Sequence, residues 1–98
     1  MARKTYSKGG RTARVTFELP AEVDAETATL VGDFNEWSPD ATPLVKRKDG
    51  RFSVTLTLAT ERCYRYRYLL DGARWENDWQ ADAYVANDHG SEDSILSL

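Results

Sequence analysis

The sequence contains one cysteine, one histidine and no long apolar run. Cys63 is the only thiol among 98 residues, so no intramolecular disulfide can form, and a reducing cytoplasm is the expected location. With His89 as the only imidazole, a zinc cluster of histidine and cysteine cannot be assembled. No segment approaches the ~20 apolar residues that span a bilayer, and polar residues follow Met1-Ala2-Arg3-Lys4, so neither a membrane partner nor export is expected.

The usual catalytic and cofactor signatures are also missing. Gly32, Gly50 and Gly72 stand singly in turns and form no phosphate-binding loop. The acidic residues between positions 82 and 93 lack the spacing of a calcium loop, which favours a solvated loop. Sixteen acidic residues could supply the two carboxylates of a glycosidase, but a sandwich this small offers no deep cleft to hold them. We therefore expect no enzyme, no catalytic residue, no metal, no cofactor and no nucleic-acid partner.

What is present suits a single globular domain. Hydrophobic residues form 41% of the chain and charged residues 30%, a balance typical of folded domains. The net charge is −3, but the first acidic residue is Glu18, and five basic residues precede it. Because residues 7–10 are Ser-Lys-Gly-Gly, we expect residues 1–11 to be a flexible basic tail and residues 12–98 to be the domain.

The hydrophobic pattern predicts an all-β fold. Val15, Phe17 and Leu19 alternate with polar residues, and the same period of two recurs in later segments separated by turn residues. No segment keeps the three-to-four spacing of an amphipathic helix. The pattern predicts an immunoglobulin-like antiparallel β-sandwich of about seven strands.

Two turns and the strands beside them are the clearest local predictions. Residues 48–51, Lys-Asp-Gly-Arg, predict a tight hairpin that leads into a strand beginning near Phe52. Residues 63–70 predict a strand with three tyrosines on one face, and Asp71-Gly72 turns it back. Residues 76–90 are polar and irregular, and residues 93–98 predict a closing strand.

Three tryptophans stand in two polar, turn-rich segments, residues 32–39 and 71–79. The C–H faces of a sugar ring can stack on an indole, while nearby amides, guanidinium groups and carboxylates bond its hydroxyls. Trp37 and Trp75 are therefore candidates for a sugar site. A tryptophan can also cap the open end of a sandwich as ordinary core, and we expect that role for Trp79.

Two arginines share the polar face of the tyrosine-rich strand. Cross-strand ion pairing is the usual explanation for charge at Arg65 and Arg67. Arg67 becomes a candidate binding residue only if an aromatic platform lies beside it.

Two segments resemble the family-48 carbohydrate-binding modules in order and spacing. They are Leu30-Val31-Gly32-Asp33-Phe34-Asn35-Glu36-Trp37 and, after the hairpin, Tyr66-Arg67-Tyr68-Leu69-Leu70-Asp71-Gly72-Ala73-Arg74-Trp75. Isoamylases and branching enzymes have such early-set domains at their N-termini, and the AMP-activated kinase beta subunit has a similar glycogen-binding domain. The likeness covers about residues 12–98 and is greatest to free-standing bacterial forms. It implies an early-set sandwich that binds α-1,4-glucan without catalysis.

The resemblance also implies particular site residues. The family's stacking tryptophans fall on Trp37 and Trp75, and its hydrogen-bonding lysine falls on Arg67, whose planar fork differs in reach. In the kinase-type domain a leucine, a threonine and an asparagine complete the site, and here those positions hold His89, Ser91 and Asp93. His89 loses the apolar contact, whereas serine and aspartate can still bond hydroxyls. The implied carbohydrate-binding residues are Trp37, Trp75, Arg67, Ser91 and Asp93.

Three function classes follow from these observations. A glucan-binding module for glycogen, starch or maltooligosaccharide comes first. A protein-interaction module of the same fold, which docks to or regulates a glycogen-metabolising enzyme, comes second because a fold does not fix a function. A hydrolytic enzyme comes last. Exposure of the tryptophans distinguishes a binding module from a merely structural one.

Overall fold

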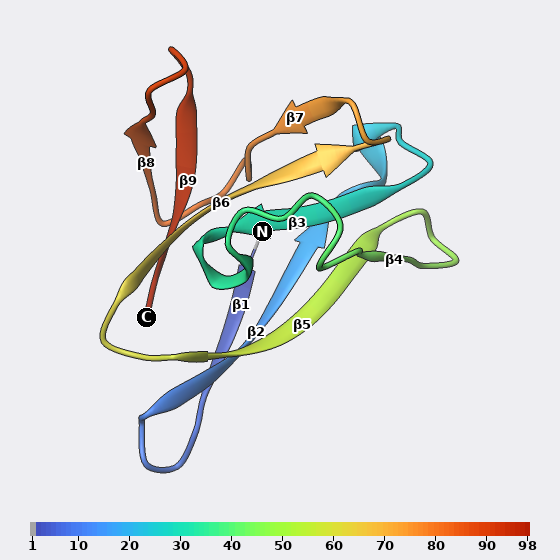
Figure 1. Ribbon diagram of the computed structural model, residues 1–98. Coiled ribbons are helices and arrows are strands. Elements are labelled where there is room, and N and C mark those ends of the chain that lie inside the picture. Colours follow the sequence, from blue (N-terminus) through green and yellow to red (C-terminus); the bar gives the residue numbers. More distant parts are fainter. Residues whose placement is uncertain (1) are drawn as a thin grey trace.

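The computed structural model describes residues 2–98, which form two antiparallel β-sheets packed as a sandwich (Figure 1). Sheet A has the strand order β1-β2-β5-β4, and sheet B has the order β3-β6-β9-β8 with β7 paired to β6. The strands are β1 (Ala2–Tyr6), β2 (Thr12–Leu19), β3 (Ala28–Gly32), β4 (Val45–Lys46), β5 (Phe52–Ala59), β6 (Cys63–Leu70), β7 (Arg74–Glu76), β8 (Ala83–Ala86) and β9 (Glu92–Ser97). Two 3-10 helices, η1 (Ala21–Val23) and η2 (Asp33–Asn35), lie between strands.

The predicted all-β sandwich is confirmed, although residues 2–98 form nine strands rather than about seven. β4 and β7 are only two and three residues long, too short for a period of two to show. β8 lies inside the segment expected to be irregular. No helix among residues 2–98 is long and apolar enough to cross a membrane.

The alternating residues of both sheets meet in one core. Phe17 of β2 and the tyrosines Tyr66 and Tyr68 of β6 are at most 1% exposed. Phe17 meets the Tyr66 ring edge-on at a centroid distance of 5.3 Å, and Tyr66 meets Tyr68 at 5.9 Å. Edge-to-face pairs of this kind add roughly 0.5–1.5 kcal/mol beyond the area they bury.

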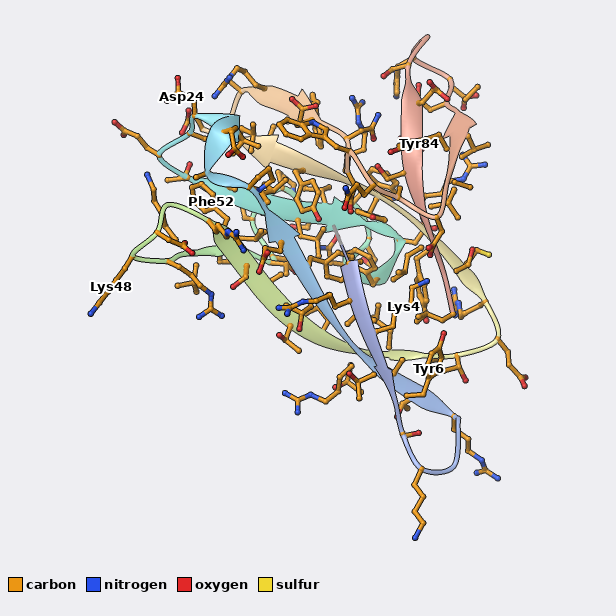
Figure 2. All side chains as sticks on the ribbon, turned by 180° about the vertical axis from the view of Figure 1, so that it is seen from behind. Lys4, Tyr6, Asp24, Lys48, Phe52 and Tyr84 are labelled. Carbon is orange, nitrogen blue, oxygen red and sulfur yellow. The ribbon has the colours of Figure 1, made fainter. Side chains whose placement is uncertain are left out.

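Both predicted turns are present. In the β4–β5 hairpin, Val45 pairs with Ser53, Gly50 has φ +89°, and Figure 2 shows Lys48 extending outward at the tip. Between β6 and β7, Leu70 pairs with Arg74 across a three-residue loop in which Asp71 and Gly72 both have positive φ and the Ala73 amide donates to the Leu70 carbonyl at 3.0 Å. The Asp71 carboxylate accepts bonds from the Thr27 and Glu26 amides, which hold its pKa below the ordinary 3.8.

The N-terminal residues differ from the flexible basic tail expected over residues 1–11. Strand β1 pairs with β2 in continuous register from Ala2–Phe17 to Tyr6–Ala13, and Ala2 packs against the core. The Lys4 Nζ also donates to Oδ2 of Asp82, the residue just before β8, at 2.6 Å (Figure 2 labels Lys4 on β1). Backbone pairing and this ion pair hold a segment whose composition has few apolar residues. Met1 lies outside the described residues.

Candidate functional site

The outer face of sheet B, opposite the core, carries the candidate site. Along β6 the tyrosines point inward, so Arg65, Arg67 and Leu69 occupy the outward positions. Val31 of β3 lies directly opposite Arg67 on this face. Val31 and Leu69 are buried, yet neither belongs to the core cluster between the sheets. They give the outer face an apolar floor.

The β3–β4 loop presents Trp37, which is half-buried. Asn35 organises the loop, because its side-chain oxygen accepts the Gly32 amide at 3.1 Å and its side-chain nitrogen donates to the Leu30 carbonyl at 2.8 Å. Glu36 and Trp37 then both adopt left-handed conformations, with φ of 56° and 58°. Two consecutive non-glycine residues in this region are strained, and such strain persists where the surroundings over-determine the conformation.

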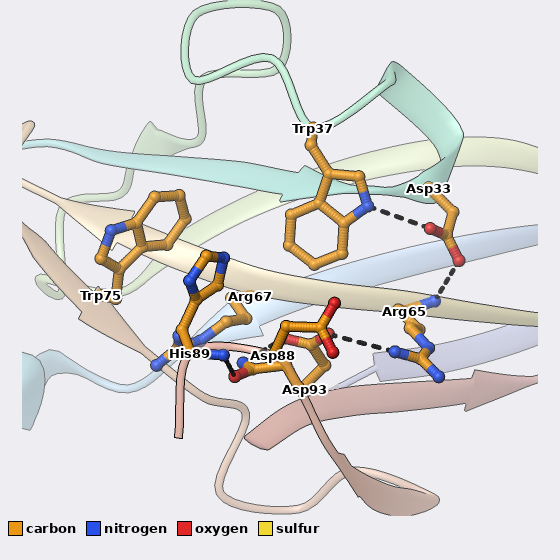
Figure 3. A pocket seen from close by; sticks show the side chains of 9 residues that line it. Asp33, Trp37, Arg65, Arg67, Trp75, Asp88, His89 and Asp93 are labelled. Carbon is orange, nitrogen blue, oxygen red and sulfur yellow. Dashed lines mark hydrogen bonds and ion pairs between the residues drawn. The ribbon is translucent and has the colours of Figure 1, made fainter. Parts of the chain in front are cut away.

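Asp33 connects this loop to the strand beneath it. Its Oδ1 accepts a hydrogen bond from Trp37 Nε1 at 3.0 Å, and its Oδ2 accepts one from the Arg65 amide at 2.8 Å. Gly32 permits this close approach, since a Cβ there would lie 2.5 Å from the Arg65 carbonyl oxygen. The carboxylate therefore fixes the edge of the Trp37 ring against β6 (Figure 3).

Trp75 lies on β7, opposite Leu69 of β6, and is 47% exposed. The Arg67 guanidinium carbon lies 5.7 Å from the centre of the Trp75 ring, which is within cation–π range. Arg67 Nε is buried and makes no hydrogen bond within residues 2–98, so the ring is its main orienting contact. The aromatic platform that makes Arg67 a candidate is thus present.

The β8–β9 loop closes the remaining side. Asn87 Nδ2 donates to Asp93 Oδ1 at 3.1 Å, while the Asn87 side-chain oxygen accepts the amides of His89 and Ser91. Asp93 is 6% exposed and faces Arg65 Nη1 at 3.8 Å on the neighbouring strand, which is the cross-strand ion pair expected for that arginine. The loop is therefore anchored at both ends.

These elements enclose one hollow, the Trp37–Trp75 pocket, with a volume of about 810 Å³ (Figure 3). It is lined by Asp33, Trp37, Arg65, Arg67, Trp75, Asn87, Asp88, His89 and Asp93. Four of the five site residues named from the sequence line it together, and so does His89. Ser91 is half-buried and is not among the lining residues.

Sequence reasoning did not select Asp33, Arg65, Asn87 or Asp88 for this pocket. Asp33 stands four residues before Trp37, a spacing that allows its carboxylate to reach the indole N–H once the loop turns back. Arg65 precedes Arg67 by two on the same strand face. Asn87 and Asp88 carry no local signal, because only the pairing of β8 with β9 brings their loop over β6.

Trp79 is not the core residue that was expected, since 55% of it is exposed. The interior position is taken by its neighbour Asp78, which is fully buried and accepts a hydrogen bond from the Tyr66 hydroxyl at 2.7 Å. Asp78 precedes a turn in which its Oδ1 accepts the Gln80 amide at 2.9 Å, and Trp79 lies in that turn with its ring outward. Burial, together with nearby Tyr68 and Asp78, raises the pKa of Tyr66 far above its ordinary value.

Within residues 2–98, no group of three or more histidine, cysteine, aspartate or glutamate side chains is placed to hold a metal ion. Cys63 is exposed as a free thiol.

The family model described as Carbohydrate-binding module 48 (Isoamylase N-terminal domain) matches residues 5–85. The chain is also 35% identical over 66 residues to the 1,4-alpha-glucan branching enzyme of Aquifex aeolicus (strain VF5). That alignment covers 66% of this chain and 10% of the enzyme, so the chain spans about a tenth of the length of this curated relative. With most of its sequence matched and its two sheets forming the expected sandwich, the chain belongs to the carbohydrate-binding module 48 family.

Proposed function

We propose that this protein binds α-1,4-glucan, such as glycogen, starch or a maltooligosaccharide, in the Trp37–Trp75 pocket and catalyses no reaction there. The observation that carries the proposal is that two accessible indoles and a guanidinium group line one hollow on the outer face of sheet B. Its volume lies within the ~300–1,000 Å³ typical of small-molecule sites. The chain's membership of a carbohydrate-binding family supports the ligand class.

In this proposal the faces of Trp37 and Trp75 stack on the C–H faces of adjacent glucose units, and Arg67 bonds their hydroxyls. Asp33 holds Trp37 in place beforehand, so little side-chain freedom is lost on binding. An open hollow competes with water for each hydroxyl. We therefore expect a Kd in the micromolar to millimolar range, or roughly −8 to −4 kcal/mol. Branched glycogen binds more tightly by avidity.

The residues of the β8–β9 loop take different roles in the proposal. His89 lies at the pocket and offers a ring nitrogen to a hydroxyl. Asp93 is nearly buried and bonded to Asn87, so it acts mainly by holding Asn87 and Arg65 at the pocket. The half-buried Ser91 supports the loop, because its backbone N–H donates a hydrogen bond to Asn87 Oδ1.

The engagement of the pocket carboxylates supports a role without catalysis. Glycoside hydrolysis needs one carboxylic acid and a second free carboxylate across the bond that breaks. Asp33 already accepts two hydrogen bonds, and Asp93 is held by Asn87 and Arg65. Among the carboxylates lining this pocket, only Asp88 lacks a hydrogen-bond or ion-pair partner within residues 2–98.

A second candidate function is a protein-interaction module that docks to or regulates a glycogen-metabolising enzyme. One observation favours it: the curated relative is a branching enzyme, and this chain matches only 10% of it. A cytoplasmic location belongs to either proposal and fits the exposed Cys63 thiol, which a reducing compartment keeps free.

Affinity electrophoresis in gels containing glycogen separates the two candidates. Wild-type protein should be retarded, whereas Trp75→Ala and the double variant Trp37→Ala/Trp75→Ala should lose most of that retardation. Tyr6→Ala is the matched control, because Tyr6 is a similarly exposed aromatic outside the pocket, and it should be retarded like the wild type. Thermal melts of the same samples separate lost binding from lost folding.

The thermal melts also test how much each tryptophan contributes to stability. Trp75 is half exposed, so its truncation should change stability little, whereas removing a core aromatic costs about 3–5 kcal/mol. Undiminished retardation of the folded double variant contradicts the proposed site. Absence of retardation in the folded wild type favours the protein-interaction module.

A further inference from the structure

Trp79 lies outside the Trp37–Trp75 pocket and borders a hollow of its own. This Trp79 groove has a volume of about 230 Å³ and shares no lining residue with the larger pocket. Its lining residues are Leu19, Pro20, Glu22, Asp78, Trp79 and Gln80. A tryptophan that is 55% exposed leaves a large apolar surface in water, which is unusual for a residue type that is mostly buried.

The groove is held rigidly from below. Asp78, on one side of Trp79, is fully buried, and its carboxylate accepts bonds from the Tyr66 hydroxyl at 2.7 Å and the Gln80 amide at 2.9 Å. The Asp78 amide in turn donates to Ser94 Oγ at 2.9 Å. The backbone on both sides of Trp79 is therefore fixed before any ligand arrives.

The orientation of the indole is set as well. Trp79 Nε1 donates to Glu76 Oε1 at 3.3 Å, which uses the only polar atom of the ring. The exposed part of the side chain is therefore an apolar plate with its polar atom already bonded. A plate fixed in this way loses little freedom on binding, which favours even a small ligand.

The chemistry around the plate fits a hydroxyl-bearing ring. Pro20 continues the apolar surface, while Leu19, which also lines the groove, is almost fully buried. Gln80 and Glu22 are exposed, and neither side chain has a hydrogen-bond or ion-pair partner within residues 2–98, so an amide and a carboxylate remain for hydroxyl groups. A hollow of this size admits one hexose unit but not a helix or strand of a protein partner.

We propose that the Trp79 groove is a second carbohydrate subsite that stacks a single glucose unit of an α-glucan on Trp79. The inference rests on the proposed function for the class of ligand, although its residues are separate from the proposed site. Two separate subsites make the protein bivalent toward a branched polymer, so one molecule can hold two chains of the same glucan or bridge two particles.

The test uses the 98-residue chain labelled with 5-fluorotryptophan, which gives one ¹⁹F resonance for each tryptophan. The resonances are assigned with Trp37→Phe, Trp75→Phe and Trp79→Phe, and maltoheptaose is the titrant. We expect all three resonances to shift, with the Trp79 resonance following its own saturation curve. In the double variant Trp37→Ala/Trp75→Ala, the Trp79 shift should persist, because no lining residue is shared.

The outcomes distinguish the inference from the proposed function. A stationary Trp79 resonance while the other two shift overturns the second subsite and leaves the first intact. A Trp79 shift that disappears in the folded double variant overturns it too, since the response then comes from the larger pocket. Shifts of Trp79 alone support the subsite and contradict the proposed function. A Trp79 shift with protein concentration but not with sugar assigns the groove to a second copy of the chain and overturns the inference.

Discussion

The outer faces of the two sheets differ far more than their inner faces do. On the outward side of sheet A, Thr16 of β2 and Thr55 of β5 face each other with their hydroxyl oxygens 3.0 Å apart, and no aromatic ring occupies an outward position of β1, β2, β4 or β5 within residues 2–98. On the outward side of sheet B, Trp75 and Arg67 lie beside their buried apolar cross-strand partners, Leu69 and Val31. Packing the core dictates the inward residues but leaves the outward ones free to differ, so a distinctive outer face points to function.

The largest expected effect separates inner from outer positions of the same sheet. Phe17→Ala removes a fully buried ring that contacts Tyr66 and should lower the free energy of unfolding by about 3–5 kcal/mol. Thr55→Ala, on the outer face of sheet A, should change it by no more than about 0.5 kcal/mol. Urea denaturation followed by circular dichroism measures both. Similar losses in the two variants would remove the distinction between the faces.

A smaller effect is expected from the carboxylate that holds the outer face of sheet B in shape. Asp33→Ala removes the acceptor for Trp37 Nε1 and the Arg65 amide, so stability should fall by roughly 1–3 kcal/mol. Because the Trp37 ring is then free to turn, maltoheptaose affinity measured by calorimetry should fall about tenfold, or ~1.4 kcal/mol.

A double-mutant cycle tests whether Asp33 acts through Trp37. Trp37→Phe keeps a ring but removes the N–H that Asp33 accepts. If the carboxylate acts by positioning, Asp33→Ala should weaken glucan binding much less in the Trp37→Phe background than in the wild type. Additive losses would show that Asp33 acts by another route, such as direct contact with the sugar.

The smallest expected effect concerns β1, the edge strand that joins sheet A to sheet B through Lys4 and Asp82. Burial raises the pKa of the Asp82 carboxyl, but hydrogen bonds from Lys4 and Ser97 outweigh it, and the net pKa lies below the ordinary 3.8. A lowered folded-state pKa gives stability that is present above pH 3.8 and is lost as the pH falls through the lower folded-state value.

Hydrogen exchange measures how much the Lys4–Asp82 ion pair stabilises β1. The amides of β1 should be protected at neutral pH by their pairing with β2, and Asp82→Asn should speed their exchange about two- to fivefold, as an exposed ion pair allows. β5, in the middle of sheet A, is the internal control and should not respond. Unprotected β1 amides in the wild type would support the sequence-based expectation that residues 1–11 form a flexible tail.

The sequence was sufficient for the fold class because alternation and turn chemistry are local. The period of two predicted β2, β5 and β6, and the Asp-Gly pairs at residues 49–50 and 71–72 predicted their turns. The short strands β4 and β7 were not predicted, because two or three residues show no period. The edge strand β1 was not predicted either, because its residues Ala-Arg-Lys-Thr-Tyr show no apolar alternation and its pairing with β2 and with Asp82 is seen only in the structure.

The site was only partly predictable for the same reason. Trp37, Trp75 and Arg67 stand in recognisable segments, and the structure brings them to one pocket. The Asn87–Asp88 loop reaches the pocket through strand pairing, which no local pattern encodes. Trp79 was misjudged because its exposure depends on the burial of Asp78, a carboxylate whose tyrosine partner lies twelve residues away.

Backbone amide mapping by nitrogen–proton NMR tests the central claim, that glucan binds the outer face of sheet B, most directly. On titration of ¹⁵N-labelled protein with maltoheptaose, we expect concentration-dependent shifts at Asp33, Trp37, Arg67, Trp75 and residues 87–89. The outward residues of sheet A, including Thr16 and Thr55, should stay unchanged. Shifts centred on those threonines, or no shift anywhere at millimolar sugar, would contradict it.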